Sequence, residues 1–236
     1  MDKCRYVPRQ YFRTALIPTI LIACLMIEVS GCATPLARTI SQYQKAAICC
    51  NSMEKFSFEP LEIGDSKSFN LNETSPAYQF STGKSYFKAF LLPQSPYPYV
   101  IVIRSYMLGD HIDSAYIFFP QVITMNKNYE LIRATDPRTF KLEKAGFIET
   151  TKETWGLMYK LEGEMRFTED NNDERYLIIQ TTDELLGAKT SLSTWRTVPV
   201  ILPGIVGVVP TGTKEVVIPH SPAGRISISI GKKTTK

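Results

Sequence analysis

The sequence predicts an all-β protein with a single β-sandwich or jelly-roll-like domain. Short runs rich in Tyr, Phe, Ile, Val and Thr recur from Phe56 onward, and turn residues separate them. No long segment shows the 3.6-residue spacing of apolar side chains that is typical of an amphipathic helix. Residues 56–236 are also enough to bury a hydrophobic core without help from metals or disulfides.

The composition excludes several classes of protein. Hydrophobic residues make up 44% of the chain and only 5 residues are Cys, which excludes a disordered acidic chain and a dense disulfide scaffold. The formal charge of +4 arises partly before residue 32, so no concentrated basic face is left to bind nucleic acid. With 2 His in the chain, we expect neither a His-based metal site nor a cofactor.

Residues 1–31 have the pattern of an export signal. A basic segment, 1–13, precedes an apolar stretch, 14–27, and small residues follow. As a helix the apolar stretch would be about 21 Å long, short of the roughly 30 Å hydrocarbon core of a bilayer. The segment is therefore better explained as a signal peptide than as a permanent transmembrane helix.

The end of this segment, VSGC, resembles the lipobox of bacterial lipoproteins. In that pattern Cys32 receives acyl chains such as palmitate and becomes the new amino terminus, and several chains on one residue anchor stably. Ala33 favours the outer membrane, because inner-membrane retention is associated with Asp at this position. The alternatives are an ordinary signal peptide with a chance Cys and an uncleaved anchor.

Residues 32–55 are predicted to tether the domain to its lipid. Residues 40–48 suit a short helix, whereas a fully extended tether would reach roughly 70 Å. Cys49 and Cys50 remain once Cys4, Cys24 and Cys32 are accounted for. They are open to a strained vicinal disulfide, to bonds with another chain that would link a partner, or to burial as thiols.

The domain, 56–236, is predicted to consist mainly of short strands. They are expected at 85–92, 99–103, 114–119, 121–125, 131–134, 157–167, 176–182, 214–218 and 225–230. Apolar and polar residues alternate at 85–92 and 225–230, and 99–103 is continuously apolar. The strand 99–103 is expected to be buried on both faces, and 225–230 to be half-exposed.

Three connections complete the prediction. Residues 183–189 suit a short helix, and 199–213, rich in Gly, Pro and Val, suit a crossing loop with a short strand inside it. The sequence SPAG at 221–224 suits a β-turn.

Four segments in order resemble the maltose-operon periplasmic protein (MalM-like) family. They are 56–61 (FSFEPL), 119–126 (FPQVITMN), 156–168 (GLMYKLEGEMRFT) and 176–182 (YLIIQTT). The resemblance covers roughly residues 56–190 and implies a periplasmic protein associated with carbohydrate uptake. It carries no catalytic residues over to this chain, and the lipobox indicates a lipoprotein member.

Two motifs resemble ligand sites but have simpler explanations. Gly83-Lys84-Ser85 resembles the end of a phosphate-binding loop, yet Tyr78 stands where that loop needs Gly and a strand follows, so a hairpin turn is expected and no nucleotide. The run EDNNDE at 169–174 could hold calcium but lacks the spacing of a calcium loop, so a solvated hairpin tip is expected.

Candidate catalytic groups are also better explained as structure. Glu162 and Glu164 lie on one strand face with Lys160 and Arg166, which indicates a charge-paired face. The hydrolase-like pairs are His220 with Ser221 and His111 with Asp113, and neither comes with a Gly-x-Ser-x-Gly turn. We therefore expect no enzyme activity.

Four aromatic residues are candidates for stacking on a sugar. Trp155 and Trp195 are the main ones, followed by Tyr97 and Tyr99, because flat rings offer an apolar face and a polar edge. Packing in the core or at its rim is the alternative for each.

Together with the signal and the lipobox, the family resemblance implies a non-catalytic periplasmic lipoprotein that assists carbohydrate uptake of the maltose or maltodextrin type. It would be anchored through lipid on Cys32, in the outer membrane, and would bind an oligosaccharide or an envelope protein. The alternative is a structural envelope lipoprotein that contacts other proteins through an exposed strand edge and binds no sugar.

Overall fold

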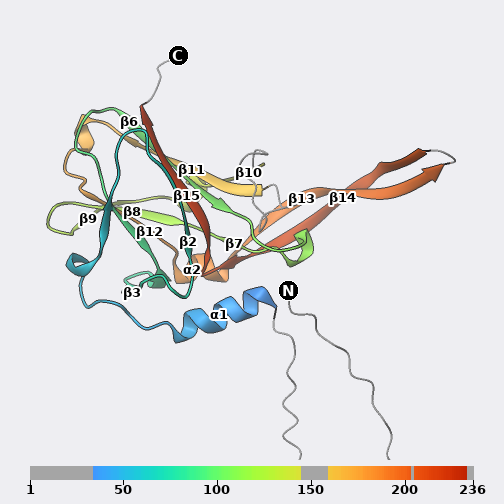
Figure 1. Cartoon of the computed structure of the whole chain (residues 1–236), viewed down its shortest axis with the longest axis horizontal. Coiled ribbons are helices and arrows are strands. Elements are labelled where there is room, and N and C mark those ends of the chain that lie inside the picture. The colour runs from blue at the N-terminus through green and yellow to red at the C-terminus, as the bar shows by residue number, and fades with distance from the viewer. Residues whose placement is uncertain (1–33, 145–158, 203–204, 233–236) are drawn as a thin grey trace, which may run out of the picture. The chain divides into compact units, whose positions relative to one another are not determined.

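The computed structural model describes residues 34–144, 159–202 and 205–232, and between 195 and 210 it describes the strand backbone alone. The predicted all-β sandwich is confirmed (Figure 1). Among the described residues, most strands belong to two five-stranded sheets. One has the order β1-β5-β12-β8-β9 and the other β10-β11-β6-β15-β2.

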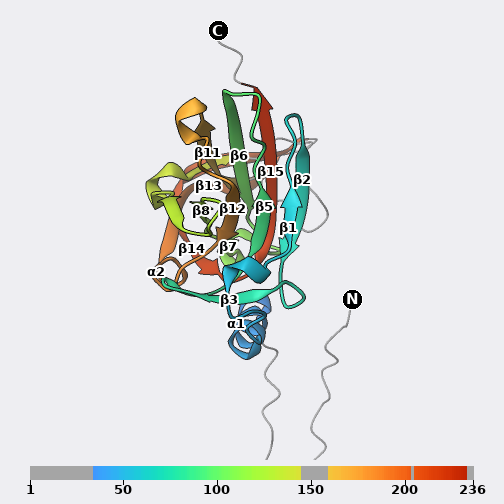
Figure 2. The same ribbon diagram turned by 90° about the vertical axis from the view of Figure 1, so that its left-hand side faces the viewer.

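The strands of the first sheet are β1 (Phe58–Pro60), β5 (Lys88–Leu91), β12 (Tyr176–Gln180), β8 (Gln121–Met125) and β9 (Leu131–Ala134). Those of the second are β10 (Lys141–Lys144), β11 (Tyr159–Phe167), β6 (Tyr99–Tyr106), β15 (Gly224–Lys232) and β2 (Ser66–Leu71). Figure 2 shows β6, β15 and β2 as neighbours in one sheet and β12, β5 and β1 in the other.

The remaining strands form two smaller units. A long hairpin consists of β13 (Lys189–Leu202) and β14 (Ile205–Ser221), and β14 pairs in parallel with the short β7 (Ile117–Phe118). A second hairpin consists of β3 (Ala77–Phe80) and β4 (Gly83–Tyr86). The helices are α1 (Pro35–Lys45) and α2 (Asp183–Gly187), with short 3-10 turns at Met53–Lys55, Ile112–Ser114, Pro137–Thr139 and Glu169–Asn171.

The main core lies between the two sheets. Alternate residues of each strand point into it, among them Phe90, Leu177, Ile103, Phe167 and Ile228. A smaller cluster covers the other face of the first sheet, where Phe56, Phe80 and Phe87 pack on Ile178 and Ile123. The first sheet is therefore buried on both faces, which explains the continuously apolar sequence of β12.

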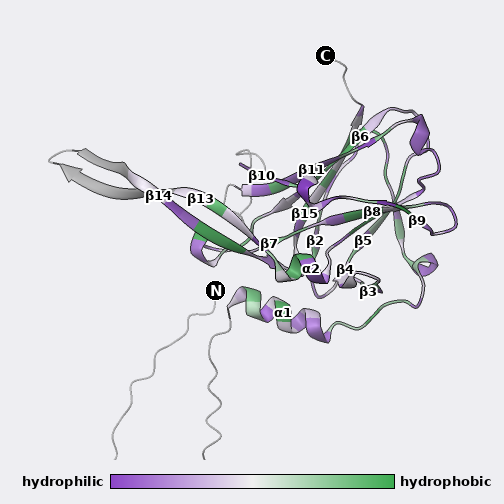
Figure 3. Cartoon of the chain, turned by 180° about the vertical axis from the view of Figure 1, so that it is seen from behind, coloured by the Kyte–Doolittle hydropathy of each residue, from purple (hydrophilic) through white to green (hydrophobic). Residues whose placement is uncertain are grey.

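The predicted tether is packed on the domain over most of its length. Thr34 caps α1 by accepting a hydrogen bond from the Ala37 N–H at 3.3 Å, and the helix begins earlier than the predicted 40–48. No residue of α1 is fully buried, and hydrophobic and hydrophilic residues alternate along it (Figure 3). Ile48 pairs with Ala77 of β3. Residues 35–48 thus do not act as an extended spacer.

Several predicted strands differ from the structure. The predicted strand 85–92 is divided into β4 and β5 at Phe87, and 114–119 is reduced to β7 because a 3-10 turn precedes it. The central strand β6 is fully buried on one face and half-buried on the other, so the prediction of two buried faces is wrong. In β15, Ser227 is buried as well, so the strand is less exposed than predicted.

The largest difference is at 199–213. The described residues of this segment, 199–202 and 205–213, belong to β13 and β14, whose pairing runs from Lys189 with Pro219 to Leu202 with Ile205, rather than to a crossing loop. The helix predicted at 183–189 is confirmed as α2, where the Thr182 hydroxyl accepts a hydrogen bond from the Leu185 N–H at 3.1 Å.

Candidate functional site

A groove of about 780 Å³ lies between α1, β2 and the connection from β6 to β7. We call it the α1–β2 groove. Its size falls within the range of pockets that bind small molecules. Five separate segments line it: Pro35, Thr39, Gln42; Ser68, Phe69, Asn70, Leu71, Asn72, Glu73; Tyr86; Leu108, Gly109, Asp110, Ser114, Tyr116; and Ala223, Gly224, Arg225.

The α1 wall is held in place by contacts at the C-terminal half of the helix. The Tyr43 hydroxyl donates a hydrogen bond to the Lys84 carbonyl oxygen, and the Tyr43 ring packs edge-on against Tyr86 at 5.6 Å. In return, Lys84 Nζ donates to the carbonyl oxygens of Gln44 (3.2 Å) and Ala46 (2.6 Å). Burial, with a smaller contribution from Asp183, raises the pKa of Tyr43 to about 12, so its hydroxyl keeps the proton that this contact needs.

Tyr86 forms the buried part of the groove. Its side chain is 1% exposed, and its hydroxyl has no hydrogen-bond partner among the described residues. Burial, and then the nearby Glu73 carboxylate, raise the pKa of Tyr86, so the phenol stays neutral. A buried hydroxyl without a partner is energetically unfavourable.

The rest of the lining combines aromatic rings with amides and carboxylates. Phe69 is half-buried against Phe90, with ring centroids 5.7 Å apart. Asn72 is fixed by the turn after β2, where its Oδ1 accepts from the Thr74 N–H (3.0 Å) and hydroxyl (2.7 Å). On the opposite wall, burial and then Asp110 raise the pKa of Tyr116.

Gly109 shapes that opposite wall. Its φ of +134° is in the left-handed region, and a Cβ there would lie 3.0 Å from Ala115 Cα. The chain therefore turns back closely enough for Leu108 to pair with Tyr116. Glycine at this position lets the connection close the groove.

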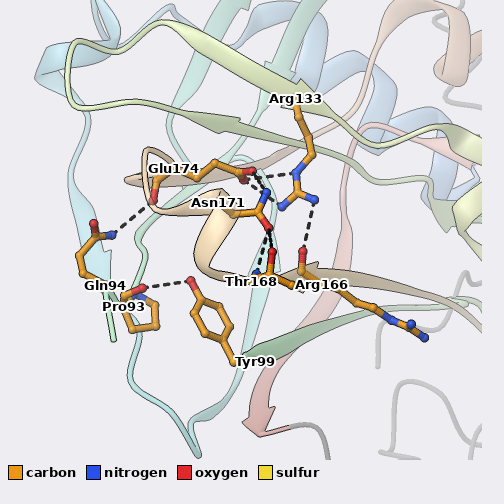
Figure 4. Close-up of polar contacts among 8 residues, drawn as sticks. All are labelled: Pro93, Gln94, Tyr99, Arg133, Arg166, Thr168, Asn171 and Glu174. Carbon is orange, nitrogen blue, oxygen red and sulfur yellow. Dashed lines mark hydrogen bonds and ion pairs between the residues drawn. The ribbon is translucent and has the colours of Figure 1, made fainter. Parts of the chain in front are cut away.

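A second, polar cavity of about 630 Å³ lies beside the connection from β11 to β12. Its central group is Glu174, which is 2% exposed. Arg133 Nη2 donates to Glu174 Oε2 at 2.9 Å, and Asn171 Nδ2 donates to Oε1 at 2.9 Å (Figure 4). Arg133 also stacks over Phe167 at 4.8 Å. Since both carboxylate oxygens have partners, this network ties β9 to the connection.

The acidic run 169–174 is therefore not a hairpin tip. It joins β11 of one sheet to β12 of the other, begins with a capping box between Thr168 and Asn171, and ends at the buried Glu174. In the part of the chain that the structure describes, no group of His, Cys, Asp and Glu is arranged to hold a metal ion.

The phosphate-loop-like and glutamate motifs have structural roles. Gly83-Lys84-Ser85 follows the hairpin turn after β3, as predicted. Burial would raise the pKa of Glu162, but hydrogen bonds and charge attraction from Lys160 (3.0 Å) and Arg104 (2.6 Å) outweigh it and lower the pKa. Glu164 and Arg166 are exposed on the same strand, 4.0 Å apart. The charge-paired face is present, although Lys160 is buried rather than solvated.

The two hydrolase-like pairs do not form. His220 is buried, with Nε2 2.8 Å from Thr190 Oγ1 and Nδ1 2.6 Å from the Leu185 carbonyl oxygen. Ser221 Oγ instead accepts from the Ala223 N–H at 3.2 Å. In the second pair Asp113 contacts Lys214, and His111 is exposed.

Of the four predicted sugar-stacking residues, the structure describes the side chains of Tyr97 and Tyr99 alone, and these two rings stack on each other. Tyr99 is 1% exposed, stacks between Tyr97 (5.3 Å) and Phe167 (4.9 Å), and donates to the Pro93 carbonyl oxygen at 3.0 Å (Figure 4), so it is core. Trp155 lies outside the described residues. Trp195 lies in β13 opposite Thr213, and its side chain is not described.

The structure describes two of the three cysteines for which a role was predicted. Cys32 lies outside the described residues, so its lipidation remains a prediction. Cys49 and Cys50 are joined to each other by a disulfide, which is one of the three alternatives left open. The Cys49 N–H donates to the Ala77 carbonyl oxygen at 2.8 Å, which places the pair beside β3.

Sequence reasoning missed the α1–β2 groove because its lining comes from segments far apart in the chain. The polar run NLNE at 70–73 was the available signal, since two amides and a carboxylate follow one another at the end of a strand. No described helix is both long and apolar enough to cross a bilayer.

Comparison with known families supports the resemblance. The model of a family described as maltose operon periplasmic protein precursor (MalM) matches residues 82–230, more than half of the chain. Three of the four resembling segments fall in this range, and 56–61 precedes it. No curated protein and no solved structure matches the chain. The chain therefore belongs to the family of maltose operon periplasmic proteins, MalM.

Proposed function

We propose that this protein is a non-catalytic, lipid-anchored accessory of carbohydrate uptake that binds a neutral oligosaccharide of the maltodextrin type in the α1–β2 groove. The anchor is lipid on Cys32, and the membrane is the outer membrane. Family membership supports a periplasmic role linked to maltose use. The α1–β2 groove is the proposed binding site for the oligosaccharide.

The observation that carries the proposal is Tyr86, which lines the groove and whose buried hydroxyl has no hydrogen-bond partner among the described residues. The group is neutral, so it suits a ligand that both donates and accepts hydrogen bonds, and a sugar hydroxyl does both. The adjacent rings of Phe69 and Tyr116 offer apolar surface to the C–H face of a sugar ring.

The charge of the lining supports a neutral ligand rather than an anionic one. Glu73 and Asp110 contribute two carboxylates, and Arg225 is the one basic residue among those that line the groove. Anionic ligands such as phosphates would meet net negative charge. The amides of Gln42, Asn70 and Asn72 hydrogen-bond neutral hydroxyls equally well as donors or acceptors.

The proposal is tested by calorimetric titration of the full chain in a mild detergent with maltose, maltotriose and longer maltodextrins. Truncation at residue 51 would be unsuitable, because it removes the α1 wall. Saturable binding is expected, and Tyr86→Phe should weaken it about fivefold to tenfold, since one hydrogen bond contributes about 1 kcal/mol. Tyr97→Phe is the matched control, because its hydroxyl is also buried without a partner but does not line the groove.

Two results would contradict the proposal. One is a lack of binding across the panel by a folded protein. The other is binding that Tyr86→Phe and Tyr97→Phe affect equally, which would place the sugar elsewhere. A preference for anionic oligosaccharides over neutral ones would overturn the assigned ligand class.

A second function, contact with an envelope protein through a strand edge, is supported by β9. This strand lies at one edge of its sheet, and its Leu131 and Ile132 are 62% and 42% exposed. A partner strand could pair there and cover both side chains. Loss of a co-purified protein in Leu131→Asp, with unchanged sugar titration, would favour this function over the first.

A further inference from the structure

We propose that the outer part of the β13–β14 hairpin, residues 197–202 paired with 205–210, docks into the surface of a phospholipid bilayer with anionic headgroups. This surface is separate from the α1–β2 groove, and the proposal does not depend on sugar binding. It follows from where the hairpin is anchored, from the residue types of its outer part, and from the residues at the boundary between the two parts.

The inner part of the hairpin is anchored in the domain. Leu192, Val216 and Ile218 are buried in the main core, and β14 pairs with β7 at His220 and Ser221. Beyond this point the two strands pair with each other only, and no third strand joins them among the described residues. The outer part is thus a two-stranded ribbon, which in water is marginally stable on its own.

The outer part is apolar in sequence on both strands. No charged residue occurs between Arg196 and Lys214, and the strands read TVPVIL and IVGVVP. In a ribbon with one face in water, polar and apolar residues alternate, because successive side chains point to opposite faces. In this sequence Val, Ile, Leu and Pro follow one another from Val198 to Leu202, so that alternation is missing. A medium that surrounds the ribbon explains this composition better than a single partner surface.

The boundary between the two parts has the composition of a membrane interface. The register shifts between Arg196 and Thr197, and the facing Gly212 has a φ of +143°, so a bulge separates the outer ribbon from the inner one. Arg196 borders this bulge, Trp195 is one register pair further in, and Lys214 is two pairs further in. Trp is enriched at bilayer interfaces, and basic residues attract anionic headgroups.

Two acidic residues lie close to these basic ones. Lys214 contacts the exposed Asp113, and Glu215 follows it on the domain side. Both lie on the inner side of the apolar stretch, so they do not enter the bilayer. Arg196 is the basic residue nearest to the outer part.

Prolines favour lipid over a pairing strand as the occupant. Pro199 and Pro210 have no N–H to offer, so they weaken any additional strand that would pair along an edge.

The length of the ribbon suits one leaflet. At roughly 3.3 Å per residue each outer strand is about 20 Å long, which is less than the roughly 30 Å hydrocarbon core. The ribbon would therefore lie in the headgroup region of one leaflet, where water can still pair with its open strand edges, without crossing the hydrocarbon core. It would provide a second membrane contact, in addition to lipid on Cys32.

The test uses the fluorescence of Trp195 in the full chain. Since the chain has 2 Trp, the variant Trp155→Phe leaves Trp195 as the reporter. The protein is reconstituted into phosphatidylcholine–phosphatidylglycerol vesicles whose acyl chains carry bromine, which quenches only nearby tryptophan. We expect strong quenching, reduced at least threefold by Val200→Asp or Val208→Asp in the same background. Val217→Asp is the matched control, because Val217 is on the inner part and is 52% exposed.

Each result of the quenching experiment either supports or overturns docking of the hairpin on the bilayer. Quenching that persists in Val217→Asp but is lost in the two outer variants, with melting temperatures of all variants unchanged, supports docking. Absence of quenching in the parent protein, or equal quenching in all variants, overturns it. Trp195 that is shielded from aqueous acrylamide but not quenched by bromine would show that protein, such as a second copy, covers the hairpin, and would also overturn it. Replacing phosphatidylglycerol by phosphatidylcholine should weaken quenching, and no change would contradict the anionic preference.

Discussion

Replacing Arg133 by Met is expected to lower the free energy of unfolding by about 2–3 kcal/mol. The substitution keeps much of the apolar contact over Phe167 but removes the charge that faces Glu174. Glu174 would then keep only the hydrogen bond from Asn171 to its other oxygen. A carboxylate that is 2% exposed would be left buried without a counter-charge.

The magnitude follows from the geometry of the pair. Arg133 donates to Glu174 Oε2 from Nη2 at 2.9 Å and from Nε at 3.3 Å. Breaking a fully buried pair costs about 3–5 kcal/mol. The Arg133 side chain is 33% exposed, so water already screens part of the interaction, and the lower figure applies. For a domain of this size the change corresponds to a fall in melting temperature of roughly 4–12 °C.

The assay is urea unfolding of the parent, Arg133→Met, Glu174→Gln and the double variant. The free energy of unfolding of the double variant should fall by at least about 1 kcal/mol less than the sum of the two single decreases, because removing both charges leaves no buried carboxylate. Arg138→Met is the control, since the ion pair of Arg138 with Asp136 is exposed, and no measurable change is expected. Additive single effects at Arg133 and Glu174 would show that the two side chains do not stabilise each other, contrary to this prediction.

Three further predictions concern stability. Burial disfavours the charged ring of His220 and holds its pKa below the usual 6.5. As the pH falls through 6.5, the unfolded chain therefore binds more protons than the folded one, and the free energy of unfolding decreases. In urea titrations from pH 7 to 5, His220→Gln should lose this slope, and the exposed His111→Gln should keep it. Gly163→Ala should destabilise by about 1–3 kcal/mol, because its Cβ would lie 2.7 Å from Phe140 Cδ1, and Phe140→Leu should restore part of the melting temperature. Gly83→Ala should lower the free energy of unfolding by more than about 1 kcal/mol, because the φ of +123° at this position is unfavourable for a residue with a Cβ. The effect should be seen as a lower melting temperature.

The strands that sequence reasoning located best are those with a strong local pattern. The bounds predicted for β8 and β9 agree with the structure, since turn residues flank each run. The edge strand β2 was missed because its sequence, SKSFNL, is mostly polar, and only its pairing with β15 makes it a strand. The outer part of β13 and β14 was missed because Pro and Gly outweighed β-branched residues in the prediction.

The candidate site was harder to predict than the fold. Tyr86 has no local feature that distinguishes it from other core tyrosines, and its significance depends on Glu73 and α1, which the fold brings to it. Motif reasoning concentrates on residues adjacent in the sequence, such as His220 and Ser221. In the structure those two side chains serve different hydrogen bonds.

The position of β15 affects when the protein can fold. This strand, Gly224–Lys232, lies between β6 and β2, and it supplies Ile226, Ile228 and Ile230 to the main core. The second sheet therefore stays divided into two pieces until the last part of the domain has been made and brought into place. For a periplasmic protein this order is favourable, because a chain that cannot complete its core during synthesis remains extended enough to be threaded across the inner membrane.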